Sequence, residues 1–111
     1  MSIASMIGKA GTTLTHERQD SEQRDAIGGR RMAWIELAAA VACWAQDAGG
    51  SIVEEYGRLD LRVSHSIYVE RDLAVRANDR LTIGATRYLV RGVRNMAGMG
   101  RLWRIDADEV R

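Results

Sequence analysis

The feature that most constrains the fold of this chain is the alternation of apolar and polar residues in NDRLTIGATRYLVRGV, residues 78–93. The apolar positions on the two sides of a GAT turn (84–86) are Leu81, Ile83, Tyr88 and Val90. Arg80 precedes the turn on the other face, and Arg87 and Arg91 follow it. Because side chains in a strand point alternately to two faces, this spacing predicts a β-hairpin with one buried face. The opposite face carries the arginines.

Three further segments alternate in the same way and are expected to form strands, at 12–18, 61–71 and 101–107. The segment 61–71 places five residues on one predicted inward face: Leu61, Val63, His65, Ile67 and Val69. Several short alternating strands in a chain of 111 residues predict a mainly β fold. We expect a small β-barrel or compact sandwich of five to six antiparallel strands with one short helix.

The segment 32–45, MAWIELAAAVACWA, is compatible with two predictions. Its alanine content favours a helix, because alanine has the highest intrinsic helix propensity. Val41, Cys43 and Ala45 nevertheless alternate with their neighbours, as they would in a strand. Periodicity does not distinguish a strand from a buried helix in so short an apolar run. Both predictions therefore stay open.

The short helix is expected at about 52–57. Ser51 and Glu54 have the spacing of a capping box, in which each side chain accepts a hydrogen bond from the backbone N–H of the other residue. Gly57 follows at a position suited to ending the helix, since glycine readily adopts the left-handed conformation there.

The chain is expected to be a single domain, 1–111, with 1–11 as an N-terminal tail and the polar stretch 19–31 as an exposed loop. Its longest uncharged apolar run is 37–45, far shorter than the roughly 20 residues of a membrane-spanning helix. We therefore expect no membrane contact.

Few residues offer catalytic or ligand-binding chemistry. His16 and His65 lie on different predicted strands without zinc-ligand spacing, and Cys43 has no CxxC partner. A Cys43–His65 dyad stays open, although no third group that would orient it is apparent. The glycines match neither of the common phosphate-binding patterns. We therefore expect no enzymatic activity, no cofactor and no metal site.

Arginine dominates the C-terminal part of the chain. Seven arginines lie between Arg76 and Arg104 inclusive, against one acid, Asp79. They either solvate the outer face of the sheet or form an interface, where arginine is enriched. A third interpretation is a small arginine-rich barrel that binds nucleic acid, with Tyr88 and Trp103 beside the arginines.

Three segments, in this order, carry a resemblance to a known family: HSIYVER (65–71), NDRLTIGATRYLVRGV (78–93) and RLWRIDADE (101–109). Trp34 and the apolar run 41–45 upstream fit the same pattern. The chain resembles the phage head–tail joining proteins, which are the head-closure, stopper or head–tail adaptor proteins of tailed phages and gene transfer agents. The resemblance covers roughly residues 12–109, most of the chain.

The resemblance implies a small β-barrel with a short helix and a mechanical role in the virion. Copies of the protein would form a homo-oligomeric ring below the portal or adaptor, close the DNA-filled head and present the docking surface for the tail. The implied partners are itself, the portal or adaptor protein, and the tail terminator and tail tube proteins. Packaged DNA would lie nearby without sequence-specific binding, and assembly would take place in the host cytoplasm. A tail completion protein of the same virion is the alternative within this class.

The resemblance also suggests which residues would meet partners. Arginines of the C-terminal part of the chain, and two acids of the acidic segment 54–60, are candidates for the subunit or partner interface: Arg80, Arg87, Arg91, Arg94, Arg101, Arg104, Glu54 and Glu55. The candidate docking loop, 19–29, carries Asp20, Glu22, Arg24 and Asp25. The candidate channel loop, 47–57, carries Asp47, Ser51 and Glu54. An acid-rich N-terminal part and an arginine-rich C-terminal part suit head-to-tail contacts between copies.

Overall fold

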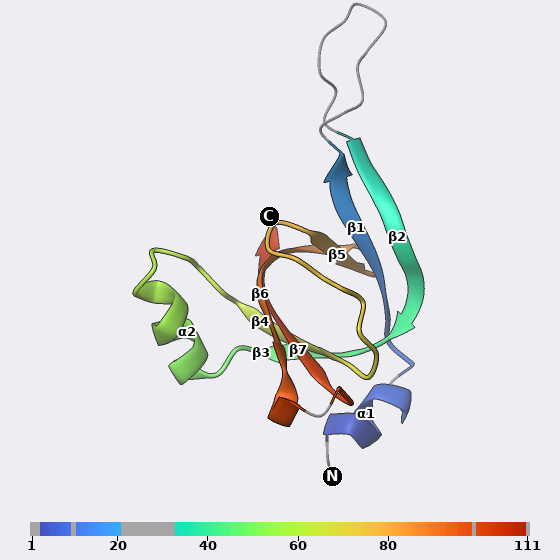
Figure 1. The fold of residues 1–111 in the computed structure, drawn as a ribbon, viewed down its shortest axis with the longest axis horizontal. Helices are drawn as coiled ribbons and strands as arrows, with labels where there is room; N and C mark the ends of the chain where they lie inside the picture. Colours follow the sequence, from blue (N-terminus) through green and yellow to red (C-terminus); the bar gives the residue numbers. More distant parts are fainter. Residues whose placement is uncertain (1–2, 10, 21–32, 99, 111) are drawn as a thin grey trace, which may run out of the picture.

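The computed structural model describes residues 3–9, 11–20, 33–98 and 100–110. The strands in these residues are β1 (Thr13–Asp20), β2 (Ala33–Ala42), β3 (Trp44–Asp47), β4 (His65–Val69), β5 (Arg80–Ile83), β6 (Thr86–Asn95) and β7 (Trp103–Val110). The helices are α1 (Ile3–Lys9), α2 (Gly50–Gly57) and one 3-10 turn, η1 (Met96–Gly98). The fold is mainly β, as predicted (Figure 1).

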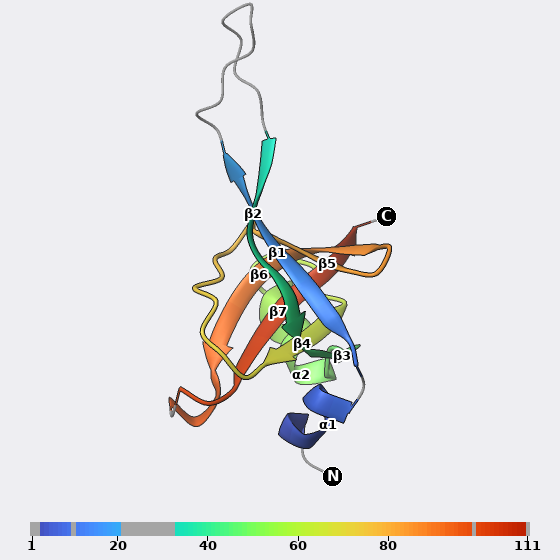
Figure 2. The same ribbon diagram turned by 90° about the vertical axis from the view of Figure 1, so that its right-hand side faces the viewer.

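The described strands form one antiparallel sheet of seven, in the order β2-β1-β5-β6-β7-β4-β3. Its two end strands, β2 and β3, follow each other directly in the sequence, with Cys43 alone between them. The chain therefore passes in one step from one end of the sheet to the other, and the sheet must curl around its core (Figures 1 and 2). Among the described residues no ladder joins β2 to β3, so the sheet is compact without being closed into a hydrogen-bonded barrel.

The alanine-rich segment is strand and not helix. It pairs with β1 from Thr13↔Ala42 to Asp20↔Ala33, and Val41 and Cys43 point into the core. Hydrogen bonding to β1 and burial of this face outweigh the helix propensity of alanine, which is only a weak preference per residue. Because the segment divides at Cys43 into β2 and β3, the described residues hold seven strands and not the five or six expected.

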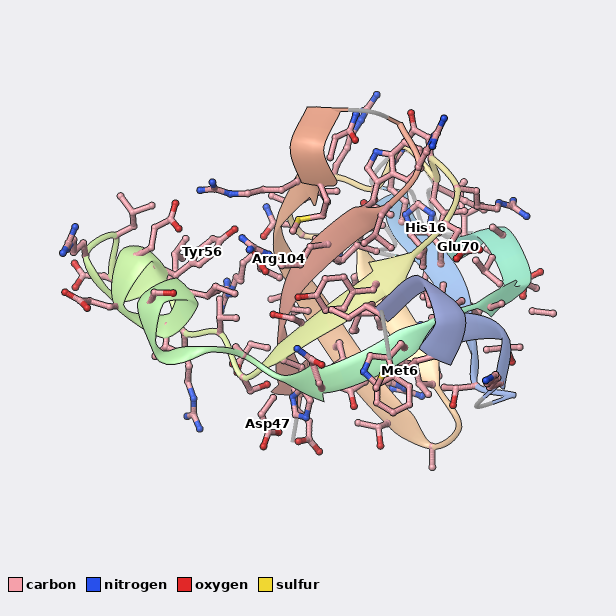
Figure 3. All side chains as sticks on the ribbon, turned by 90° about the horizontal axis from the view of Figure 1, so that it is seen from below. Met6, His16, Asp47, Tyr56, Glu70 and Arg104 are labelled. Carbon is pink, nitrogen blue, oxygen red and sulfur yellow. The ribbon has the colours of Figure 1, made fainter. Side chains whose placement is uncertain are left out.

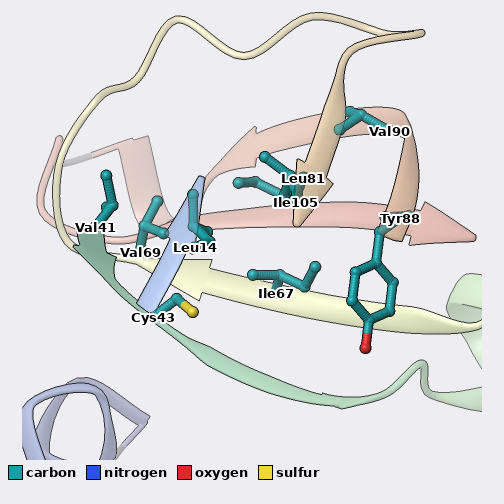
Figure 4. Packing of buried hydrophobic residues seen from close by; sticks show 10 residues of the cluster. Leu14, Val41, Cys43, Ile67, Val69, Leu81, Tyr88, Val90 and Ile105 are labelled. Atoms are coloured by element: carbon teal, nitrogen blue, oxygen red, sulfur yellow. The ribbon is translucent and has the colours of Figure 1, made fainter. Parts of the chain in front are cut away.

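The core lies inside the curled sheet. Its buried members come from six of the seven described strands and from the Cys43 junction, and partly buried Ala45 of β3 packs against them (Figure 4). They are Leu14, Val41, Cys43, Ile67, Val69, Leu81, Tyr88, Val90, Ile105 and Ala107. The inward face predicted for the hairpin 78–93 is confirmed, since Leu81, Tyr88 and Val90 are buried. Gly84 has φ 60° in the turn, a left-handed conformation that glycine adopts without a steric penalty.

The strand predicted at 61–71 is shorter than expected and is buried on both faces. Regular pairing is confined to β4, and Ser66 and Tyr68, predicted to point outward, are buried. Helix α1 explains part of this burial, because it packs against β3 and β4 and buries Ile7. The segment 1–11, predicted to be a tail, therefore contributes a helix to the body of the protein.

Helix α2 confirms the short helix predicted at 52–57, but it begins earlier. Its N-cap is Gly49, which makes no side-chain capping bond, so the capping box predicted for Ser51 and Glu54 is not formed. None of the eight residues of α2 is buried. The helix projects from the sheet on the side away from β2 (Figure 1).

The core predicts a contrast between two leucines. Leu81 is fully buried, so Leu81→Ala should lower the free energy of unfolding by about 2–5 kcal/mol through lost burial and a cavity. Leu59 is 66% exposed, and Leu59→Ala should change it by less than about 0.5 kcal/mol. Urea denaturation followed by tryptophan fluorescence measures both values. Equal effects of the two substitutions would contradict this assignment of the core.

Candidate interaction surface

Arg80, the first arginine of the hairpin, is engaged within the chain. Its guanidinium donates to the Glu17 carboxylate of β1 at 3.2 and 2.9 Å and lies 4.3 Å from the centre of the Trp34 ring. The hydrogen bond from Arg80 holds the pKa of Glu17 below its usual value. Both side chains of the ion pair are only 17% exposed. Through Glu17 and Trp34, the arginine links three strands, β5, β1 and β2.

Arg104 of β7 is also engaged within the chain. It donates from Nε and from a terminal nitrogen to the two oxygens of Asp106, at 2.9 and 3.2 Å. Asp106 is fully buried, and it also accepts a hydrogen bond of 2.8 Å from the Tyr56 hydroxyl of α2. Burial first, and then the bond to Asp106, raise the pKa of Tyr56 to about 12. Figure 3 shows Tyr56 reaching from α2 toward Arg104.

Gly92 makes this attachment of α2 possible. A Cβ atom added at Gly92 would lie 2.3 Å from the Tyr56 hydroxyl oxygen, closer than real contacts allow. Position 92 sits directly opposite Asp106 in the β6–β7 ladder, beside a bulge between Val90 and Gly92. An ion pair between Arg94 and Glu55 is the second polar contact that holds this helix. Two polar contacts, and no buried apolar side chain of α2, thus connect the helix to the sheet.

A further carboxylate, Asp79, fixes the segment between β4 and β5. Asp79 is 3% exposed and accepts hydrogen bonds from Arg18, from His16 Nε2 at 2.8 Å and from the backbone N–H of Arg76 at 2.9 Å. Burial acts to raise the pKa of Asp79, but the bonds from Arg18, His16 and Arg76 outweigh it and hold the pKa below its usual value. His16, which lies on β1 as the predicted strand 12–18 implied, is a fully buried member of this cluster.

The remaining arginines of the predicted interface lie nearer to solvent. Arg87 of β6 and Arg101 are exposed, whereas Arg91 is half-buried and donates to the backbone carbonyl of Arg62 at 3.3 Å. Arg94 is paired with Glu55, as described. The hairpin therefore does not present a continuous arginine face. The interface predicted for these residues stays a prediction, to which Arg87 and Arg101 contribute the most accessible charges.

The structure describes all of the candidate channel loop but little of the candidate docking loop. Of the candidate docking loop, Glu22, Arg24 and Asp25 lie outside the described residues, and Asp20 ends β1. The candidate channel loop is ordered as the end of β3 and as α2. Asp47 has a side chain 96% exposed, 3.6 Å from His65, and Ser51 is exposed on the first turn of α2. Glu54 pairs with Arg58 one helical turn later, at 2.9 Å.

The groups considered for catalysis are occupied in packing. Cys43 is buried, and burial raises the pKa of its thiol to about 11, so it is protonated near neutral pH. His65 packs edge-on against the Tyr88 ring and lies 2.8 Å from the Ser64 hydroxyl. Within residues 3–9, 11–20, 33–98 and 100–110, no group of three or more His, Cys, Asp and Glu side chains is arranged to hold a metal ion. No helix in the described part of the chain is long and apolar enough to cross a membrane.

Sequence reasoning missed the polar contacts that attach α2. Asp106 follows buried Ile105 in a strand, so the alternation alone predicts that the Asp106 side chain points outward into solvent. Its partner Tyr56 lies 50 residues away, and no local pattern links them. One signal was present: an isolated glycine inside a strand, as at Gly92, often marks close approach of another part of the chain.

Comparison with known proteins identifies the fold. No family model matches the chain, and no curated protein matches it. The solution structure of protein SF1141 from Shigella flexneri 2a superposes with a TM-score of 0.67 at 14% identity, over 89% of this chain and 94% of that one. A chain in the virion of a native gene transfer agent particle superposes with a TM-score of 0.51 at 20% identity, over 87% of this chain and 92% of that one. At these identities, the likeness is one of fold.

The attachment of α2 predicts a local effect for Gly92→Ala. The added methyl group should displace the Tyr56 hydroxyl from Asp106, because the side chain of Tyr56 can move while the strand cannot. A hydrogen bond to a charged group contributes on the order of 1.5–3 kcal/mol. Its loss should make local opening of α2 easier, so that exchange of the amide hydrogens in 50–57 accelerates about tenfold or more. Hydrogen exchange by NMR measures this, with the core amides as reference.

Gly57→Ala is the matched control for Gly92→Ala. A Cβ at Gly57 meets nothing within 4 Å, so exchange in α2 should not accelerate. Tyr56→Phe should reproduce the effect of Gly92→Ala, and the double variant should add little, since both changes remove the same bond. Fully additive effects would contradict the proposed contact.

The Asp79 cluster predicts a dependence of stability on acid. Because the folded pKa of Asp79 lies below the unfolded value of about 4, its stabilisation is fully present above about pH 4 and is lost as the pH falls through the folded pKa. Asp79→Asn should lower the free energy of unfolding by roughly 1–3 kcal/mol at pH 7 and flatten its fall below pH ~4. Urea denaturation between pH 7 and 2.5 tests this, with Asp60→Asn as an exposed control. An unchanged acid slope in Asp79→Asn would show that the cluster does not stabilise the fold.

Proposed function

We propose that this protein is a structural component of a tailed particle, at the connector between head and tail. Copies form a ring below the portal or adaptor, close the DNA-filled head and provide the surface on which the tail docks. The observation that carries this proposal is the shared fold with a chain of a gene transfer agent virion, over most of both chains. The order of the segments 65–71, 78–93 and 101–109 supports it independently.

The structure suits a mechanical role. Its buried carboxylates, Asp79 and Asp106, are bonded to side chains of other elements and tie the sheet into one unit. Of the groups with catalytic chemistry, Cys43 and His16 are buried in that unit, and half-buried His65 packs edge-on against Tyr88. We infer that the protein is not an enzyme and that it acts through its outer surfaces. Its partners are other copies of itself, the portal or adaptor, and the tail terminator and tail tube proteins.

A small nucleic-acid-binding barrel is the rival proposal. Exposed Arg87 and Arg101 favour it, with Trp103 half-buried nearby in the sequence. The intramolecular pairs of Arg80, Arg94 and Arg104 oppose it, because they remove three cations from the cluster that would meet phosphates. A phosphate-driven complex must weaken steeply with salt, by a slope set by the number of phosphates contacted. A tail completion protein of the same virion shares the mechanical class and differs only in its neighbours.

Quantitative mass spectrometry of purified DNA-filled particles from the source tests the proposal. We expect the chain at several copies per particle, in a fixed ratio to the portal protein, because a ring has a defined number of subunits. Particles that have lost their DNA should contain fewer copies of this chain. Particles lacking the chain altogether would overturn the proposal, and salt-dependent binding to single- and double-stranded DNA would then be measured.

A further inference from the structure

The structure presents a projecting helix on one side and an open pocket on the other, and we propose that α2 of one copy docks into the pocket of the next. This inference rests on the proposed ring and names its contact. The inserted side chains are Val53 and Leu59. The receiving pocket is lined by α1, the end of β2 and the residues after β4.

The pocket is an open cleft of about 300 Å³ lined by Ile7, Ala40, Val41, Ala42, Glu70 and Arg71. Its floor is apolar, since Ile7 and Val41 are almost fully buried beneath it. Its rim is built from small residues, Ala40 and Ala42, which leave space that larger side chains would fill. Glu70 and Arg71 add one charge of each sign at the edge. The cleft thus accepts one or two aliphatic side chains flanked by charges.

Helix α2 and the residue that follows its cap have the complementary features. Tyr56 turns toward the sheet, while Val53 is 44% exposed and Leu59 is 66% exposed. Exposed aliphatic side chains on a projecting helix gain free energy when another surface covers them. Glu54 and Arg58 lie beside them, with side chains 69% and 75% exposed. The helix therefore offers two aliphatic side chains flanked by one acid and one base.

The two surfaces lie on opposite sides of the molecule. Figure 1 places α2 on one side of the sheet and α1 with the end of β2 on the other, and Figure 3 shows Tyr56 and Glu70 at opposite ends of the view from below. A contact between two different patches is heterologous, and repeated copies then build a ring when the rotation closes. A second copy is the occupant that the structure itself supplies.

Charge gives the contact its direction. In the docked arrangement Glu54 of the helix faces Arg71 of the pocket, and Arg58 faces Glu70. Each charged side chain then meets one of the opposite sign. Complementary pairs at the edge of an apolar contact fix orientation and exclude other arrangements. The anchor formed by Tyr56, Asp106 and Arg94 would hold α2 in the orientation from which it reaches a neighbour.

Cross-linking of the full-length chain tests the contact. Val53→Cys is combined with Ala42→Cys, and a short bismaleimide is added to the concentrated chain and, in parallel, to DNA-filled particles that contain it. We expect a ladder of dimers, trimers and larger species. Buried Cys43, with its thiol pKa raised to about 11, should leave the wild-type chain unlinked. The matched control is Val53→Cys with Ala85→Cys, because Ala85 is exposed in the β5–β6 turn and outside the pocket.

Charge reversal, in the Val53→Cys and Ala42→Cys background, tests the pairing. Glu54→Arg or Arg71→Glu alone should reduce the rate of cross-linking about tenfold, and the two together should restore at least half of it. All four side chains are exposed, so the variants should unfold at the same urea concentration as the parent.

The outcomes separate this inference from the proposed function. A ladder equal to that of the control pair, a double reversal that restores nothing, or no ladder in either sample would overturn the docking of α2. Particles that contain the chain at ring stoichiometry without the cross-link would leave the connector function in place and remove this contact. A ladder from a chain absent from all particles would support self-association through α2 and overturn the connector function.

Discussion

The fold depends on one constraint, the single residue between the two end strands of the sheet. Because Cys43 alone separates β2 from β3, the chain steps from one end of the strand order to the other, and the seven described strands must curl around one interior. Cys43 is fully buried, and its backbone N–H donates to the carbonyl of Thr12 at 3.0 Å. The curl gives the sheet one enclosed face, filled by the core. It also sets α1 and the end of β2 apart from α2.

Charge in this protein is directed inward as much as outward. Arg80, Arg104 and Arg18 each bind a carboxylate on a neighbouring element or strand position, and Asp79 and Asp106 are buried with several donors each. Breaking such a pair leaves an uncompensated charge in a buried site, which costs far more than a surface pair contributes. These clusters therefore specify how the segments before β5 and after β3 attach to the sheet. The accessible charges that remain for partners are fewer than the composition suggests.

Period-two alternation was sufficient to predict the mainly β fold, the hairpin 78–93 and the inward positions of Leu81, Tyr88 and Val90, because each is decided by neighbours in sequence. The state of 32–45 was not decided in this way, since its strand depends on pairing with β1. The burial of Asp106 and Asp79 depends on Tyr56, Arg18 and His16, which lie 50 to 63 residues away. The sequence predicted the candidate interface only as a set of charged residues. Which of these residues form ion pairs within the chain, and which stay accessible, could be seen only in the structure.

Helix α2 is held to the sheet by polar contacts that leave Val53 and Leu59 exposed, as the docking proposed above requires. A helix that buried Val53 and Leu59 against its own sheet would be more firmly held but would have nothing apolar to offer a neighbour. Here Tyr56 and Glu55 bind Asp106 and Arg94 instead, and these directional bonds fix the helix while leaving Val53, and Leu59 beyond its cap, exposed. Gly92 is the structural condition for this arrangement, because any side chain there would displace the tyrosine. One glycine in a central strand thereby links the packing of the sheet to the surface that α2 presents.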